Sequence, residues 1–366
     1  MILKVSDRFV WRKCLYFNEF SFTWRFDSVA STFSYNFYFD PDNQAHKELA
    51  CVSHYHLCKL YDSDDGQTEG ELLLTGIITK QNFKASAIPK HLSGFAGYSK
   101  PGQLEDSKIH PDYYPLQSNK LSLVEIAKKL IKPFKLDLVV DSSVSAKANK
   151  VFDTTNASES STVKDFLFEL AKQKDIIISH NEEGELLFTE ASPNDPPILE
   201  FDLRKGSIPG VDFDFEFDGS GMHSHIIVQG QAGIDGGNAK QYQLRNPYVP
   251  IIWRPAVISQ SSGDDNDSSL CARRELAKEL RGLKWTIALD RWKIDGVLIR
   301  PGKTVKILAP ELYGYVEVNL FIESVDFVGN TEKKTATLHC VLPEVYTNQI
   351  PVSIYKGINM TAKPHI

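Results

Sequence analysis

The chain has 366 residues, which is too long for one ordinary hydrophobic core, so its length predicts two or more domains. Its composition, with 42% hydrophobic and 24% charged residues, is normal for a soluble globular protein. The net charge of -6 argues against specific nucleic-acid binding, because an acidic protein lacks the positive field that attracts phosphates.

The first residues, MILKVSDRFVW, lack the uninterrupted apolar run of a signal peptide. No stretch approaches 18 apolar residues, so we expect no membrane insertion by the chain itself. The cysteines are few, odd in number and scattered, which argues against a disulfide framework and favours folding in a reducing cytoplasm. They are Cys14, Cys51, Cys58, Cys271 and Cys340.

The first hundred residues predict β structure. Aromatic and β-branched residues gather in runs that turn-forming residues separate. The runs are FSFTWRF (20–26), FSYNFYF (33–39), ELLLTGIIT (71–79) and LSGFAGY (92–98), and the turns are DPDN (40–43) and DSDDGQTEG (62–70). The second turn does not keep the spacing of a calcium-binding EF-hand, because Gly66 falls where a ligand should be, so we interpret it as a hairpin tip.

Helical periodicity begins in SLVEIAKKLIKPF (122–134), where apolar residues form one stripe. Ser122 and Glu125 fit a capping box, in which each side chain accepts a hydrogen bond from a backbone N–H at the start of the helix. A second helix is predicted at 162–172. DIIISHNEEGELLFTE (175–190) then predicts a hairpin that turns at 181–184.

The chain returns to β structure after the linker ASPNDPP (191–197). A polar loop at 261–267 leads into a helix predicted at 268–281, with Gly282 as a left-handed terminator. Four further runs predict strands, namely WTIALDRW (285–292), KTVKILAP (303–310), EVNLFIESVDFVG (317–329) and TATLHCVLP (335–343).

A weak internal repeat relates residues 72–98 to residues 320–346. Each copy has an apolar strand, a polar turn with lysines and a second alternating strand, and a further strand precedes each copy. The repeat predicts two related β domains in one chain, with the α+β part inserted between them.

The segment CVSHYHLC (51–58) contains two cysteines and two histidines. On a regular strand His54, His56 and Cys58 share one face while Cys51 points away, so a four-ligand zinc site cannot form from the strand alone. Three ligands could still join a partner from elsewhere, but no second ligand cluster is evident. We therefore interpret these as ordinary strand residues.

The strand VDFDFEFDG (211–219) alternates acidic and apolar residues. Its acidic face consists of Asp212, Asp214, Glu216 and Asp218, and its apolar face of Val211, Phe213, Phe215 and Phe217. Paired carboxylates occur in glycosidases, but four at a period of two are typical of a solvated face over an apolar core. We expect this face to line a channel or a wet subunit boundary.

Two other patterns give weaker signals. GQAGIDGG (230–237) fails the spacing of a dinucleotide-binding loop, and HSH (223–225) is interpreted as structural. P-loop, zinc-protease and serine-hydrolase motifs are absent from the sequence. We assign no catalytic, cofactor-binding or metal-binding residue, and we expect no enzyme and no cofactor.

The order of these segments resembles that of the baseplate hub proteins of contractile-tailed phages, namely the Mu-like tail proteins and the late control protein D family. Tyr98 departs from the family, which usually has Arg in its Gly-Arg-Ser segment. The residues that carry the resemblance are SVASTFSYNFYF (28–39), ELLLTGIITK (71–80), LSGFAGYSKPGQLEDSKI (92–109), SLVEIAKKLIKPFKLDLVVDSS (122–143), IIVQGQ (226–231), ARREL (272–276) and LIRPGKTVKILAPEL (298–312).

The resemblance implies an α+β, mainly β fold with two tail-tube-like β-barrel domains and an inserted small α+β domain. The expected divisions are a first tube-like domain at 1–118 completed by 205–232, the α+β domain at 119–204, a connecting segment with a helix at 233–284, a second tube-like domain at 285–346 and a C-terminal extension at 347–366.

The resemblance also implies a structural function. Three chains would form a pseudo-sixfold ring that joins the tail tube to the central spike and lets DNA or effector pass. Implied partners are the other two chains of the homotrimer, the tube and spike proteins, other baseplate proteins and the tape measure protein. The implied location is the virion tail baseplate, after assembly in the host cytoplasm.

Three alternatives remain open from the sequence. The first is a hub of a type VI secretion system or another contractile injection system. The second is a cell-wall-degrading tail enzyme with Asp214 and Glu216 as acid and base. The third is a tail protein that binds host-surface carbohydrate through exposed Tyr and Phe residues.

Overall fold

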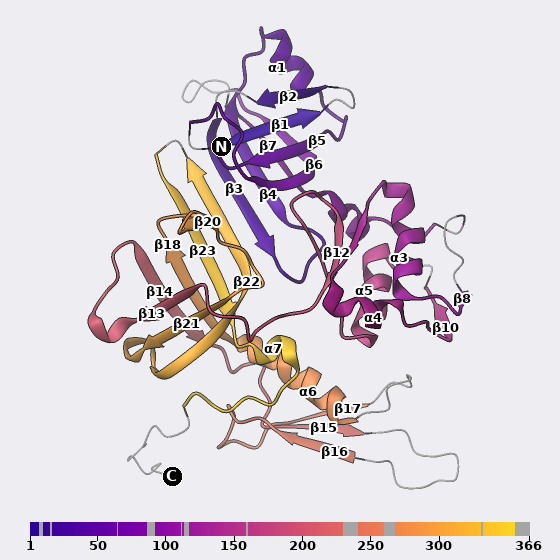
Figure 1. Ribbon diagram of the computed structural model, residues 1–366, viewed down its shortest axis with the longest axis vertical. Helices are drawn as coiled ribbons and strands as arrows, with labels where there is room; N and C mark the ends of the chain where they lie inside the picture. Colours follow the sequence, from indigo (N-terminus) through magenta and orange to yellow (C-terminus); the bar gives the residue numbers. More distant parts are fainter. Residues whose placement is uncertain are drawn as a thin grey trace. The chain divides into compact units, whose positions relative to one another are not determined.

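The computed structural model shows a mainly β protein with several short helices, which confirms the predicted fold class (Figure 1). It describes residues 1–6, 10–14, 17–63, 65–85, 92–110, 112, 117–158, 160–229, 241–259, 268–330 and 332–355. The chain divides into two compact units. Unit 1 contains residues 1–190, 290–299 and 325–336, and unit 2 contains residues 191–289, 300–324 and 337–366.

The first part of unit 1 is an antiparallel sheet in the order β3-β4-β7-β6-β5-β1-β2. Its four predicted strands are confirmed as β3, β4, β6 and β7. Within the described residues this order is an open path, so the sheet is not the closed barrel that was expected. The elements are β1 (Ile2–Ser6), β2 (Trp11–Cys14), β3 (Phe17–Arg25), β4 (Thr32–Tyr38), α1 (Gln44–Leu49), β5 (Leu57–Tyr61), β6 (Leu72–Phe83) and β7 (Leu92–Ser99).

Aromatic side chains form the core of this sheet. Alternate residues on β3 and β4 are fully buried, because successive side chains of a strand point to opposite faces. Two aromatic residues from later segments of unit 1 pack on them. The ring centroids of Trp292 and Phe20 are 5.9 Å apart, and those of Phe327 and Phe22 are also 5.9 Å apart. Each buried ring contributes roughly 2–3 kcal/mol of hydrophobic free energy, so the later segments help to hold the first sheet together.

The second part of unit 1 is a small α+β region. Ser122 and Glu125 form the predicted capping box at the start of α3, and Thr162 caps α5. The hairpin β11–β12 turns at the predicted place, with Gly184 at φ 79°. The elements are α2 (Gln103–Asp106), β8 (Gln117–Asn119), α3 (Leu123–Ile131), β9 (Leu138–Val140), α4 (Ser142–Asn149), β10 (Thr154–Asn156), α5 (Val163–Gln173), β11 (Ile177–His180) and β12 (Leu186–Thr189), with the single-turn helices η1 (Lys100–Gly102) and η2 (Lys132–Phe134).

One hydrophobic core serves this region. The apolar stripes of α3 and α5 face the sheet β11-β12-β9, in which β12 and β9 run parallel. The core contains Leu123, Ile126, Leu130, Phe166, Leu170 and Phe188 among others. The helices therefore form because their periodic apolar residues can be buried together.

Unit 2 contains a sheet that includes the order β14-β18-β23-β22, with β21 paired to β22 and β13 paired to β21. Its three-stranded sheet has the order β16-β15-β17, and α6 packs on β15 and β16 (Figure 1). Its elements are β13 (Leu199–Asp202), η3 (Leu203–Lys205), β14 (Val211–Phe217), β15 (His225–Gln229), β16 (Gln241–Arg245), β17 (Pro255–Ser259), α6 (Ser268–Glu279), η4 (Leu280–Gly282), β18 (Leu283–Leu289), β21 (Thr304–Ala309), η5 (Pro310–Leu312) and α7 (Glu344–Thr347).

The strands β22 (Gly314–Asn330) and β23 (Lys334–Val341) have residues in both units. The short strands β19 (Lys293–Ile294) and β20 (Val297–Leu298) form a hairpin in unit 1. Both copies of the predicted repeat form neighbouring strands, β6 with β7 and β22 with β23. The preceding strands also correspond, since β5 pairs with β6 and β21 pairs with β22.

The expected role of Gly282 is wrong. Its φ is not positive, and the last turn before β18 is a 3-10 turn. Glycine is needed for another reason, since a Cβ here would lie 2.3 Å from the carbonyl oxygen of Asp218. The backbone N–H of Asp218 in turn donates to the carbonyl of Gly282. Close backbone approach, rather than helix termination, selects glycine at this position.

Among the described residues, none of the helices has the length and apolar character needed to cross a membrane.

Candidate functional site

The segment CVSHYHLC is mostly a loop. Strand β5 begins only at Leu57, and Ser53 and Tyr55 have left-handed backbones with φ of 64° and 47°. The expectation that His54, His56 and Cys58 share a strand face is therefore wrong. Instead, the Sγ of Cys51 lies 3.3 Å from Nε2 of His54, so the loop brings together two residues that a regular strand would separate.

The other two residues of this segment are buried. The Nδ1–H of His56 donates to the carbonyl of Ser6, and Cys58 lies on β5 opposite Gly76. Burial raises the pKa of the Cys58 thiol, which keeps it protonated and a poor metal ligand. Within the described parts of the chain, no group of three or more His, Cys, Asp or Glu residues is placed to hold a metal ion.

The acidic strand β14 lies at the end of its sheet and pairs with β18. Its carboxylates at 212, 214 and 216 are exposed, as expected for a solvated face. Its apolar face is anchored by rings, with Phe213 5.0 Å from Phe201 and Phe215 stacked 4.7 Å from Trp285. Asp218 leaves the strand and accepts a hydrogen bond from the backbone of Ser220. These carboxylates are therefore exposed on the outer strand of the sheet.

The turn at 62–70 joins β5 to β6, as the hairpin prediction required. Asp65 accepts hydrogen bonds from the backbone and hydroxyl of Thr68 and from the backbone of Gln67, which hold the pKa of its carboxyl well below the usual range. The Asp65 carboxylate therefore has local partners without a cation. The predicted glycine cluster at 230–237 lies outside the described residues.

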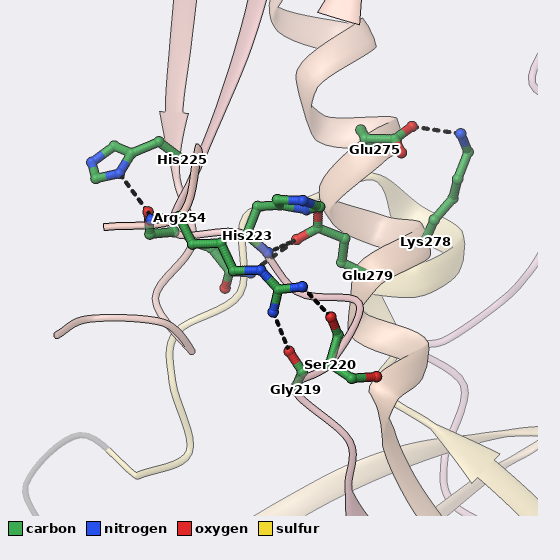
Figure 2. Close-up of polar contacts among 10 residues, drawn as sticks. Gly219, Ser220, His223, His225, Arg254, Glu275, Lys278 and Glu279 are labelled. Carbon is green, nitrogen blue, oxygen red and sulfur yellow. Dashed lines mark hydrogen bonds and ion pairs between the residues drawn. The ribbon is translucent and has the colours of Figure 1, made fainter. Parts of the chain in front are cut away.

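The HSH segment leads into β15, and its His223 is hydrogen-bonded to Glu279 of α6 (Figure 2). The backbone N–H of His223 donates to Oε2 of Glu279 at 2.9 Å, and the Nδ1 of His223 lies 2.7 Å from Oε1 of the same carboxylate. The Glu279 side chain is only 6% exposed, and Asn246 also donates to it. This network supports the structural interpretation of the segment. Sequence reasoning missed Glu279, because it is 56 residues away from His223.

Arg254, which sequence reasoning also missed, fixes the loop between β16 and β17. Its guanidinium donates to the carbonyls of Gly219 and Ser220 (Figure 2), and its backbone N–H donates to Oγ of Ser224. The residues just before it, Ile251–Trp253, are exposed. The sequence does mark this loop, because three consecutive large apolar residues stand between Pro250 and Arg254.

Tyr98, the departure from the resembled family, has a defined partner, since its hydroxyl donates to Asp106 at 2.9 Å. Burial, together with the nearby acidic groups, raises the pKa of Tyr98 to about 12. Tyr98 lines a half-open pocket of about 370 Å³ in unit 1, with Tyr55, Leu57, Ile77, Lys100, Gln103, Phe134 and Lys135. The ammonium of Lys100 is already bound to the carbonyl of Lys135.

The comparison with family models matches residues 104–190 to "Baseplate hub protein gp44-like, second domain". Residues 104–190 are thus similar to the second domain of gp44-like baseplate hub proteins. This match covers the α+β region that contains α3 and α5, and it confirms the resemblance predicted from the sequence. No curated protein matches the chain.

Solved structures extend the similarity to nearly the whole chain. The 43 kDa tail protein of prophage MuSo2 from Shewanella oneidensis has 17% identity and a TM-score of 0.76, covering 94% of this chain and 98% of that protein. The tail protein from Neisseria meningitidis MC58 has 18% identity and a TM-score of 0.74, covering 95% and 98%. These matches show that the chain shares the fold of the two tail proteins.

A more distant match is the E. coli c3393 protein, described as a component of the type VI secretion system with structural similarity to the T4 bacteriophage tail proteins gp27 and gp5. It has 9% identity and a TM-score of 0.55, covering 96% of this chain and 80% of that protein. The fold is therefore common to phage tail and secretion-system proteins.

Proposed function

We propose that the chain is a structural baseplate hub of a contractile phage tail. The observation that carries this proposal is the pair of full-length fold matches to phage tail proteins, together with the gp44-like hub domain at residues 104–190. The secretion-system component has a lower TM-score and is covered less completely, which favours the phage tail over a type VI hub.

The proposed assembly is a homotrimeric ring that joins the tail tube to the central spike and lets DNA or effector pass. The repeat supports it, because β5-β6-β7 and β21-β22-β23 have the same strand order. Two related β units in each of three chains would give the pseudo-sixfold ring that a sixfold tube and a threefold spike require. We also propose the domain division that the resemblance implies, with tube-like domains at 1–118 and 285–346, because these two segments contain the repeated strand order.

The proposed partners are the tail tube, the spike, other baseplate proteins and the tape measure protein, and the proposed location is the virion baseplate after assembly in the host cytoplasm. We propose no enzymatic activity. The exposed position of Asp214 and Glu216 on an edge strand supports this choice over the cell-wall-degrading alternative, because both side chains face solvent.

Light scattering and electron microscopy of the purified protein test the proposal. We expect a mass of three chains and a ring with a central opening. A monomer at all concentrations, or a trimer without an opening, would contradict the proposed hub. A peptidoglycan zymogram tests the enzyme alternative, and clearing that Glu216→Gln abolishes would revive it.

A further inference from the structure

The sheet β16-β15-β17 in unit 2 has one buried face and one open face. Helix α6 packs on β15 and β16, where Ile226, Val228 and Leu244 are buried. The alternate residues point to the opposite face, because side chains alternate along a strand. There Ile227 is only half-buried and its neighbour on β17, Val257, is 56% exposed. The open face is therefore partly apolar.

The loop from β16 to β17 extends this open face. Ile251, Ile252 and Trp253 are 84%, 58% and 69% exposed, and Ile251 is the most exposed large apolar residue among those described. The ring of Trp253 lies 4.7 Å from that of His225, which belongs to the open face of β15. We call the whole surface the Trp253 face, and it consists of His225, Ile227, Arg245, Ile251, Ile252, Trp253 and Val257.

Hydrogen bonds hold the loop in place at both ends. Arg245 donates to the carbonyl of Pro250 at 3.1 Å, and Asn246 accepts from the backbone of Tyr248 at 2.9 Å. At the other end, Arg254 bonds to the 219–220 carbonyls and to Ser224. A preorganised loop loses little conformational freedom on binding, so its exposed side chains can serve as an interface anchor. Exposed Trp and Ile side chains held in this way mark an interaction site rather than scattered surface residues.

Charge indicates what covers the face. The described residues of the Trp253 face include the cation Arg245 and no carboxylate, although the chain carries a net charge of -6. A matching surface would combine carboxylates with an exposed aromatic residue. Strand β14 offers this combination, because Asp212 and Asp214 are exposed at a sheet edge and Phe217 is 47% exposed at the end of the strand.

We propose that the Trp253 face of one chain binds the acidic edge strand β14 of a second copy of this chain. The contact joins two different surfaces, so it is head-to-tail, and such a contact builds a closed ring when the rotation between neighbouring copies is one third of a turn. This inference rests on the proposed homotrimer and names the surfaces that close it. It also explains why a strand with a row of carboxylates stays at an open edge, since like charges keep it from pairing before a cationic partner arrives.

Self-association of the full-length protein tests the proposal, measured by sedimentation over a range of concentrations. Trp253→Ser should raise the dissociation constant at least about 30-fold, the loss typical of an interface anchor. Arg245→Glu alone and the triple change Asp212→Lys, Asp214→Lys and Glu216→Lys alone should each weaken association. Arg245→Glu combined with the triple change should restore a large part of it, because the charges then match again.

Matched controls separate this effect from general surface changes. Val352→Ser removes an apolar residue of unit 2 that is 72% exposed, and Glu332→Lys reverses an exposed charge in unit 1. Both should leave the dissociation constant unchanged. Far-UV circular dichroism spectra of all variants should match that of the wild type, since the changed side chains lie at the surface.

The outcomes distinguish the two proposals. A wild-type protein that stays monomeric overturns both the homotrimer and this interface. A wild-type trimer that tolerates Trp253→Ser overturns the interface alone. A trimer that Trp253→Ser disrupts but the triple β14 change does not would show that another surface covers the Trp253 face, which also overturns the inference.

Discussion

The carboxylate of Asp62, just after β5, lies 2.8 Å from the ammonium of Lys334 on β23, 272 residues later in the chain. Lys293 approaches the other carboxylate oxygen at 2.7 Å. The Asp62 side chain is only 4% exposed. Burial alone would raise the pKa of Asp62, but the hydrogen bonds and charges of the two lysines outweigh it and lower that pKa. Asp62 therefore links the first sheet to the late segments of unit 1.

Asp62→Asn should lower the free energy of unfolding by about 1–3 kcal/mol, because it removes a buried charge that two half-exposed lysines share. Urea denaturation at pH 7 measures the change. Asp42→Asn, at an exposed position of the same unit, serves as the control and should stay within about 0.5 kcal/mol of the wild type. Equal midpoints for the two variants would show that the Asp62 contacts contribute no net stability.

The sequence predicted local features of the fold well. The capping box of Ser122 and Glu125 and the stripes of α3 and α5 depend on residues three or four apart, so the pattern itself carries the information. The alternating acidic strand 211–217 was predictable for the same reason, since strand exposure follows a period of two.

The contacts of distant residues were not predictable. CVSHYHLC was expected to be a strand, but β5 begins at Leu57 because its pairing with β1 starts where Leu57 meets Ser6. The imidazole of His56 is hydrogen-bonded to the carbonyl of Ser6, which lies 50 positions earlier in the chain. The buried carboxylate of Glu279 and the loop anchor Arg254 likewise depend on tertiary contacts. Periodicity carries no information on contacts over such separations.

His180 predicts a pH dependence of stability. It is buried, its Nε2 accepts from the hydroxyl of Ser31 at 2.7 Å, and its Nδ1–H donates to the carbonyl of Asn181. Burial lowers the pKa of His180 to about 4 in the folded protein, from 6.5 in the unfolded chain. Between these values only the unfolded state takes up the proton, so stability falls as the pH decreases from about 6.5 to 4. The total loss is on the order of 3 kcal/mol.

Urea midpoints of the wild type and His180→Gln at pH 7 and pH 5 test this dependence. Glutamine can keep a hydrogen bond to Ser31 but cannot titrate, so His180→Gln should lose less stability between the two pH values than the wild type. His110→Gln, at an exposed position, should behave as the wild type. A pH dependence that is the same in all three proteins would contradict a neutral buried His180.

The five cysteines should differ in reactivity. Cys14, Cys58 and Cys340 are buried, and burial raises the pKa of each thiol, whereas Cys51 and Cys271 are half-exposed. Only the thiolate reacts with an aromatic disulfide reagent, so the native protein should show two fast thiols and the unfolded protein five. Cys51→Ser with Cys271→Ser should abolish the fast phase. A fast phase that survives this double change would show that a buried thiol is accessible.

Replacing Gly282 by a larger residue should destabilise the protein through a steric clash. In Gly282→Ala the new Cβ would lie 2.3 Å from the carbonyl oxygen of Asp218 and 2.9 Å from Cε of Met222. Met222 can adjust, but the backbone of Asp218 is held by its hydrogen bond to Gly282. We expect the free energy of unfolding to fall by about 1–3 kcal/mol. Gly221→Ala is the matched control, because nothing lies within 4 Å of a Cβ there. Thermal denaturation of both variants decides the question, and a Gly282→Ala protein as stable as Gly221→Ala would mean that the β14 end can move away from η4.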